Sequence, residues 1–126
     1  MNINEYKGIL ENIVHNTLYI LDDINEKDEH SFTPLHYATQ EFSTKKECLE
    51  ISKKLLCSGA DIEARDNSGE TPLMQAAINN QNSEVIKTLL NAGADINEKD
   101  DNGWTPLMHA AINNENLEVF KTLLEA

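Results

Sequence analysis

The residue types that could do chemistry in this chain are four histidines, two cysteines and several neighbouring carboxylates. Imidazoles and thiols can act as nucleophiles, general bases or metal ligands, and a pair such as Asp100–Asp101 could supply acid–base groups or hold a cation. The histidines, however, lie far apart, without the spacing of a metal site: His15, His30, His36 and His109. The sequence also lacks the phosphate-binding glycine motifs, the H-E-x-x-H motif and the C-x-x-C pattern. We therefore expect no enzyme, no cofactor and no metal site.

The cysteines indicate the cellular compartment, and the net charge indicates the class of partner. Cys48 and Cys57, nine residues apart in a helix-forming stretch, favour free thiols over a disulfide. We therefore expect a reduced, intracellular protein in the cytoplasm, with export as an effector left open. The net charge of −12 would repel phosphate backbones, and no apolar run approaches the ~18 residues of a membrane span, so neither nucleic acid nor a membrane is an expected partner. A basic protein is the natural complement, because opposite charges speed association.

The acidic pairs recur because the chain repeats itself. The string DINEKD occurs at 23–28 and again at 95–100, and the related DIEARD occupies 61–66. Each copy leads, after four further residues, into Thr-Pro-Leu. Since the carboxylates recur together with these segments, they indicate a role in a turn rather than in catalysis.

Each repeat predicts a helix, a turn, a second helix and a hairpin. The threonines before proline are expected N-caps, and the missing N–H of proline costs nothing at the first helical position: Thr33-Pro34, Thr71-Pro72 and Thr105-Pro106. The alanines of Ala-Ala-Ile-Asn, at 76–79 and 110–113, let neighbouring helices approach closely. The second helix should stop at Gly59 and at Gly93, each in a left-handed C-terminal cap.

Together these signals resemble the ankyrin repeat, which has a period of about 33 residues and the signature T-P-L-H-x-A. TPLHYA at 33–38 matches that signature, and LLNAGADIN at 89–97 resembles the segment in which the second helix ends. The resemblance covers residues 23–126 and implies an all-α repeat solenoid, with helix-turn-helix units linked by short hairpin loops. We expect a single domain divided into an N-terminal helical cap (1–27), a first repeat with an insertion (28–65), a second repeat (66–99) and a truncated third repeat (100–126).

The units also depart from one another. From Thr33 to Asp61 the first spans 28 residues, whereas the second spans 24 from Thr71 to Asp95. The four extra residues should fall within 39–48, as longer helices or as a longer loop. Ser31 stands where the other two hairpin tips have glycine, so the first tip should be less ideal. The last unit repeats the interior apolar pattern at Ile112, Val119, Phe120, Leu123 and Leu124. Either the last helix shifts to bury these side chains, or an apolar strip stays open at the C-terminal end, and we expect this end to mediate weak self-association.

The resemblance implies that hairpin tips and the exposed side of the first helices bind another protein. The expected contacts at the tips are Glu29, His30, Phe32, Arg65, Asn67, Ser68, Glu70, Asp101, Asn102 and Trp104. Those on the first helices are Tyr37, Ile78, Asn79, Ile112 and Asn113, and Gln75 and His109 share the position of Tyr37. Phe32 and Trp104 are the most informative, because large aromatics often dominate binding energy. The alternative is that both rings pack on neighbouring hairpins.

The favoured function is therefore a non-enzymatic protein–protein interaction module that binds a basic partner on its concave surface. One alternative is an immunity-type inhibitor that neutralises a basic toxin or nuclease. Another is a microbial effector that binds a host protein, since the Asn- and Ile-rich composition hints at an AT-rich, microbial genome. An enzyme is the least supported reading.

Overall fold

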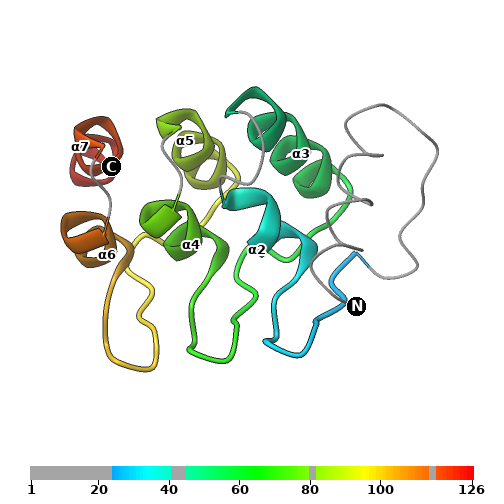
Figure 1. Ribbon diagram of the computed structural model, residues 1–126. Coiled ribbons are helices and arrows are strands. Elements are labelled where there is room, and N and C mark those ends of the chain that lie inside the picture. Colours follow the sequence, from blue (N-terminus) through cyan, green and yellow to red (C-terminus); the bar gives the residue numbers. More distant parts are fainter. Residues whose placement is uncertain (1–23, 41–44, 80–81, 114–115) are drawn as a thin grey trace.

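Three helix pairs stand side by side in the computed structural model, which describes residues 24–40, 45–79, 82–113 and 116–126 (Figure 1). The pairs are α2 (Pro34–Thr39) with α3 (Lys45–Cys57), α4 (Pro72–Asn79) with α5 (Ser83–Asn91), and α6 (Pro106–Asn113) with α7 (Leu117–Glu125). First helices pack on first helices and second helices on second helices, with the hairpins extending from one side of the array. None of the described residues lies in a β-strand. The predicted all-α repeat solenoid is confirmed.

The first helix of each unit begins as its Thr-Pro pair predicts. The N–H groups of Met74 and Met108 donate to the hydroxyls of Thr71 and Thr105, at 3.4 Å each. In the first unit His36 adds a reciprocal bond, because its Nδ1 accepts the N–H of the N-cap residue, Thr33, at 3.1 Å. A side-chain acceptor therefore satisfies an otherwise unpaired N–H at every one of these starts.

The second helices end at the predicted glycines. Gly59 has φ +97° and Gly93 has φ +100°, both in the left-handed region. The N–H of Ala60 donates to the carbonyl of Leu55 across the end of α3, at 3.0 Å. The corresponding bond from Ala94 closes α5, also at 3.0 Å. These are the hydrogen bonds of a Schellman cap, so glycine is needed here for its backbone conformation.

The first unit differs from the others mainly in its second helix. Helix α3 has 13 residues, whereas α5 and α7 have 9 each. Helix α2, however, has 6 residues against the 8 of α4 and of α6, and five residues separate α2 from α3 whereas three separate α4 from α5. The four extra residues are therefore shared between the helices and the connection, so neither alternative alone accounts for them. Residues 41–44 of the same connection, and most of the expected N-terminal cap at 1–27, lie outside the described residues.

Alanine allows the first helices to approach closely. Ala38, Ala76 and Ala110 are each at most 1% exposed, and each belongs to the apolar core that runs through the array. Larger side chains from both helix layers complete that core: Leu35, Ile51, Leu55, Leu73, Val85, Ile86, Leu89, Val119 and Leu123. No helix in the described part of the chain is both long and apolar enough to cross a bilayer.

Part of the apolar surface of the last unit stays open. Met108 is 48% exposed, whereas its counterpart Met74 is fully covered by the following unit. The exposed large apolar side chains of this unit are Met108, Ile112, Leu117 and Leu124, and together we call them the end strip. Val119 and Leu123 are buried in the apolar core instead, and Phe120 is half-buried against it.

Candidate functional site

Each hairpin is organised by one aspartate: Asp28, Asp66 or Asp100. Its Oδ1 atom accepts the N–H groups of the residues two and four positions later, at 2.8–3.0 Å. The repeated acidic residue at this position therefore has the turn role that the sequence indicates.

The second oxygen of each of these aspartates ties the hairpin to the first helix of its own unit. Oδ2 accepts a hydrogen bond from the residue nine positions later, which is Tyr37, Gln75 or His109. These three side chains are only 7%, 4% and 6% exposed. Tyr37, predicted as a binding contact, is buried here, and its hydroxyl donates to Asp28. The regular nine-residue spacing of Asp with a hydrogen-bonding partner is a signal that the sequence analysis missed.

The two aromatic residues at the tips pack against the first helix of their own units. The Phe32 ring stacks on the His36 imidazole, with centroids 5.4 Å apart and planes 7° apart. The Trp104 indole lies 5.2 Å from the His109 ring, at 48°. Both aromatic residues are half-buried, so each retains a partly accessible face beside the hairpin.

Contacts between successive hairpins hold the tips in line. The N–H of Asn67 donates to the carbonyl of His30, and the N–H of Asp101 donates to that of Ser68, both at 3.1 Å. Arg65 also spans two hairpins, because its Nη1 donates to the Lys99 carbonyl at 2.7 Å and its guanidinium pairs with Glu98. Arg65, predicted as a binding contact, is therefore occupied by contacts within the array.

Several of the other predicted contacts are accessible. Glu29 and His30 are exposed at the first tip, as are Asn67 and Ser68 at the second and Asp101 and Asn102 at the third. On the first helices, Asn79 is exposed and donates to Gln75, Ile78 is half-buried, and Ile112 belongs to the end strip. The side chain of Asn113 lies outside the described residues.

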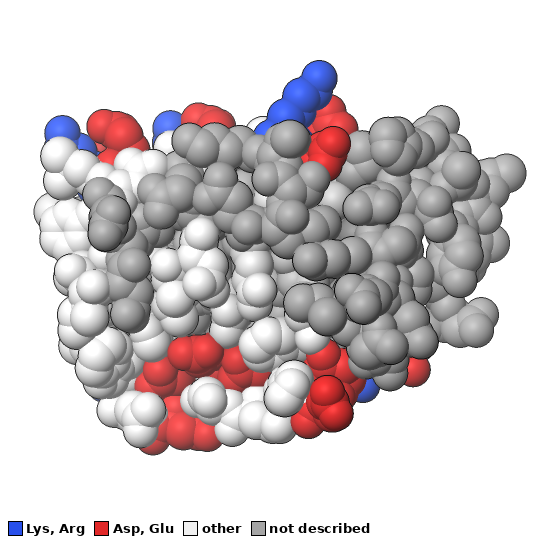
Figure 2. Space-filling view, viewed as in Figure 1, with Lys and Arg blue, Asp and Glu red and all other residues white. Residues whose placement is uncertain are grey.

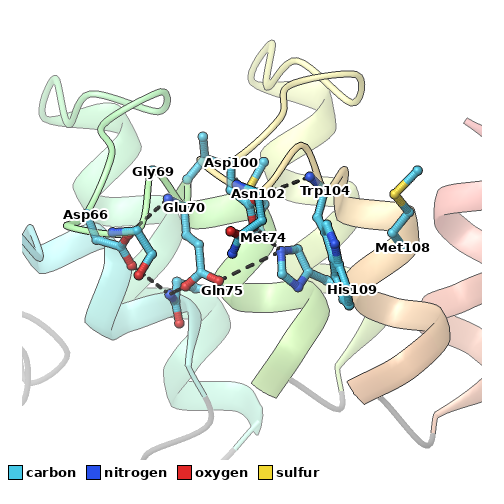
Figure 3. Close-up of polar contacts among 12 residues, drawn as sticks. Asp66, Gly69, Glu70, Met74, Gln75, Asp100, Asn102, Trp104, Met108 and His109 are labelled. Carbon is cyan, nitrogen blue, oxygen red and sulfur yellow. Dashed lines mark hydrogen bonds and ion pairs between the residues drawn. The ribbon is translucent and has the colours of Figure 1, made fainter.

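Carboxylates converge where the second hairpin meets the third unit (Figure 3). Glu70 accepts a hydrogen bond from Gln75 at 2.8 Å and lies 3.8 Å from His109 Nε2. Burial raises the pKa of the Glu70 carboxyl, and the neighbouring Asp66 and Asp100 raise it further. Burial alone would also raise the pKa of Asp100, but hydrogen bonds from Trp104, His109 and Asn102 hold it below its ordinary value.

Figure 2 shows acidic side chains along the hairpin edge of one face, and acidic and basic side chains together along the opposite edge. Acidic side chains gather near the hairpins, below the largely uncharged surface of the first helices. Most of the lysine and arginine side chains visible in this view lie at the opposite edge, over the second helices. The hairpin side of this face is therefore the more negative side.

Protonation of His36 makes the stability of the folded protein depend on pH. His36 Nε2 lies 2.9 Å from the Glu70 carbonyl, and since Nδ1 accepts the N–H of Thr33, the neutral ring satisfies both contacts. Burial lowers the pKa of His36, and the bond to Glu70 offsets only part of that shift. Folded protein therefore binds a proton at His36 less readily than unfolded protein, so stability falls as pH drops below the unfolded value of about 6.5.

We expect His36→Met, which gives the first unit the residue of the other two, to cost about 1–2 kcal/mol at pH 7 through two lost hydrogen bonds. The difference between wild type and variant should shrink between pH 7 and 5, because only the wild type loses this contribution. Urea unfolding of both proteins across that range measures this difference in the free energy of unfolding. The contributions of the other histidines are the same in both proteins, so they cancel in the difference. A difference that stays constant with pH would contradict this role of His36.

Comparison with known proteins agrees with this arrangement. Residues 41–126, more than half of the chain, match the family described as ankyrin repeats (3 copies), so the chain belongs to the ankyrin-repeat family. Protein fem-1 homolog A from Rattus norvegicus and from Homo sapiens, and protein fem-1 homolog A-A from Mus musculus, are each 36% identical to it over 78 residues. That match covers 56% of this chain but only 12% of each relative. The repeats indicate a protein–protein interaction module.

Proposed function

We propose that this ankyrin-repeat array binds a basic protein through the acidic hairpin side of its first-helix face. The observation that carries the proposal is the row of acidic side chains near the hairpins (Figure 2), where Asp101 is exposed and Glu70 and Trp104 are half-buried. A net charge of −12 gives the whole molecule the sign that attracts a cationic partner. Cys48 and Cys57 form no disulfide, which supports an intracellular setting.

The residues around Trp104 suit a lysine or arginine side chain of the partner. Asp101 and Asn102 are exposed at the same tip as Trp104, and both side chains carry oxygen acceptors. A cation over an indole face gains about 0.5–2 kcal/mol, and a nearby carboxylate adds a charge-assisted hydrogen bond. Large aromatics in this kind of setting are frequent binding hot spots.

Affinity purification of the tagged chain tests this proposal, with wild type compared with a double variant, Glu70→Lys with Asp101→Lys. We expect a dominant basic partner in the wild-type eluate and its loss from that of the variant. A double variant with the same change in charge on the second helices, Glu50→Lys with Glu125→Lys, should retain the partner and so serves as the control. Equal retention by both variants would contradict binding at the hairpins.

The identity of the captured protein separates the narrower readings of the same surface. A basic toxin or nuclease would indicate an immunity-type inhibitor, and a host protein would indicate a microbial effector. In both cases the acidic surface acts by blocking or recruiting its partner, and no catalytic step is required.

We also propose that the end strip mediates weak self-association. Ile112 is 66% exposed and Leu124 is 59% exposed, so two copies could cover these side chains through the same patch. Ile112→Lys should abolish a concentration-dependent dimer in sedimentation equilibrium, because a lysine buried in that contact has no partner. A wild type that stays monomeric at millimolar concentration would contradict the proposal.

A further inference from the structure

We propose that Glu70, Asp100 and His109 form a binding site for a divalent transition-metal ion, and that Zn²⁺ suits these donors best. One donor is an imidazole nitrogen and two are carboxylate oxygens, and all three atoms lie within 4.8 Å of one another. Imidazole and carboxylate are ordinary zinc ligands, and zinc sites with three protein ligands hold water at the fourth position. The inference does not rest on the proposed protein partner.

The spacing of the donors suits a single ion. His109 Nε2 lies 2.8 Å from Asp100 Oδ2 and 3.8 Å from Glu70 Oε2. Two ligand atoms on a tetrahedral zinc ion with bonds of about 2.0–2.1 Å lie roughly 3.3 Å apart, midway between these distances. We expect the Glu70 side chain to move when the ion binds, because it is 19% exposed, whereas the side chains of His109 and Asp100 are 7% and 3% exposed.

Among the described residues, the carboxylates of the site outnumber the one group beside them that can carry positive charge, which is His109 itself. Asp66, Glu70 and Asp100 converge on one side of His109, and in the described part of the chain no lysine or arginine pairs with any of them. Like charges brought together away from water either take up a proton or bind a cation. A divalent ion at His109 would neutralise two of these carboxylates directly.

The hydrogen bonds of His109 indicate which ring nitrogen a metal ion would bind. The Nδ1 atom of His109 is buried and has no hydrogen-bond partner among the described residues, so the neutral ring carries its proton on Nε2 and donates it to Asp100. A metal ion would take the place of that proton on the same nitrogen, which faces both carboxylates. Because Nδ1 would then hold a proton without an acceptor, we expect weaker binding than at zinc sites whose histidines have such an acceptor.

The first and second units have no histidine at the position of His109. The position of His109 is occupied by Tyr37 in the first unit and by Gln75 in the second, neither of which is an ordinary zinc ligand. The hairpin aspartate is present in all three units, so the histidine is what sets the third unit apart. His109→Gln therefore gives the third unit a side chain that the fold already accommodates at the same position.

Calorimetric titration of the chain with ZnCl₂ tests the site, in a Cys57→Ser background that removes the exposed thiol. We expect one Zn²⁺ per chain. His109→Gln and Glu70→Gln should each weaken binding by more than about tenfold, the loss seen even when an outer-shell partner is changed. His30→Gln removes an exposed histidine beside Glu29 and should leave the affinity unchanged.

Thermal unfolding in the presence of metal ions gives a second test of the site. Saturating Zn²⁺ should raise the melting temperature of the Cys57→Ser protein and not that of Glu70→Gln, whereas Mg²⁺, which prefers oxygen ligands, should raise neither. Glu70 is the most exposed of the three donors, with its side chain 19% exposed, so its variant decides the question if His109→Gln fails to fold. No Zn²⁺ binding at millimolar concentration, or equal binding by both variants and the parent, would overturn the inference, and neither result bears on the protein partner.

Discussion

Gly69→Ala is expected to destabilise the array by about 2–5 kcal/mol, the largest effect of any single-methyl addition considered for the hairpins. Gly69 has φ +76°, where an alanine costs about 1–2 kcal/mol. Its new Cβ would also lie 2.5 Å from Asp101 Oδ1 and 2.9 Å from Asp101 N, so the third hairpin would have to move. Such overpacking adds about 1–3 kcal/mol. Urea or thermal unfolding measures the loss.

Gly103→Ala is the matched control, because it occupies the same place in the next hairpin. Its φ is +79°, nearly that of Gly69, but an added Cβ would meet none of the described atoms within 4 Å. We expect a loss of only about 1–2 kcal/mol, from the backbone conformation alone. Equal losses for the two variants would show that the tips are not packed as closely as the hydrogen bond between Ser68 and Asp101 indicates.

Trp104→Ala is expected to weaken binding of the captured partner at least tenfold, or about 1.4 kcal/mol. The indole packs on His109, so the variant should also lose some stability, and affinity has to be measured well below its melting temperature. Trp104→Phe is the control, since the first unit carries Phe32 at this position and a phenyl ring keeps an aromatic surface.

Calorimetry or surface plasmon resonance gives the affinity, and circular dichroism gives the stability. The predicted pattern is a loss of affinity for Trp104→Ala that Trp104→Phe largely restores. A variant that loses stability but binds normally when folded would instead make Trp104 a packing residue, and it would then be removed from the proposed surface.

The features that the sequence predicted well are those that neighbouring residues determine. A Thr-Pro start needs only the N–H groups of the next turn, as at Thr71, and a glycine stop needs only a positive φ, as at Gly93. Both depend on local backbone geometry, which repeats whenever the residues repeat. The positive φ of Ser31, at +61°, follows from the same alignment with the glycines of the other tips.

The features that the sequence did not reveal depend on contacts between units. Arg65 looks like a free surface cation, but the next hairpin supplies Glu98, 33 residues later, as its partner. Likewise Glu70 and His109 are 39 positions apart, so no local spacing marks them as one cluster with Asp100. Such contacts depend on how the units stack.

The rate at which the captured partner associates, measured against salt concentration, tests the central claim most directly. If the acidic hairpin side attracts a basic protein, the association rate should fall steeply as salt rises from about 0.05 to 0.5 M, because screening shortens the reach of surface charges. The dissociation rate should change less. The Glu70→Lys and Asp101→Lys pair should associate slowly even at low salt. An association rate independent of salt, and equal for wild type and this variant, would contradict the proposed function.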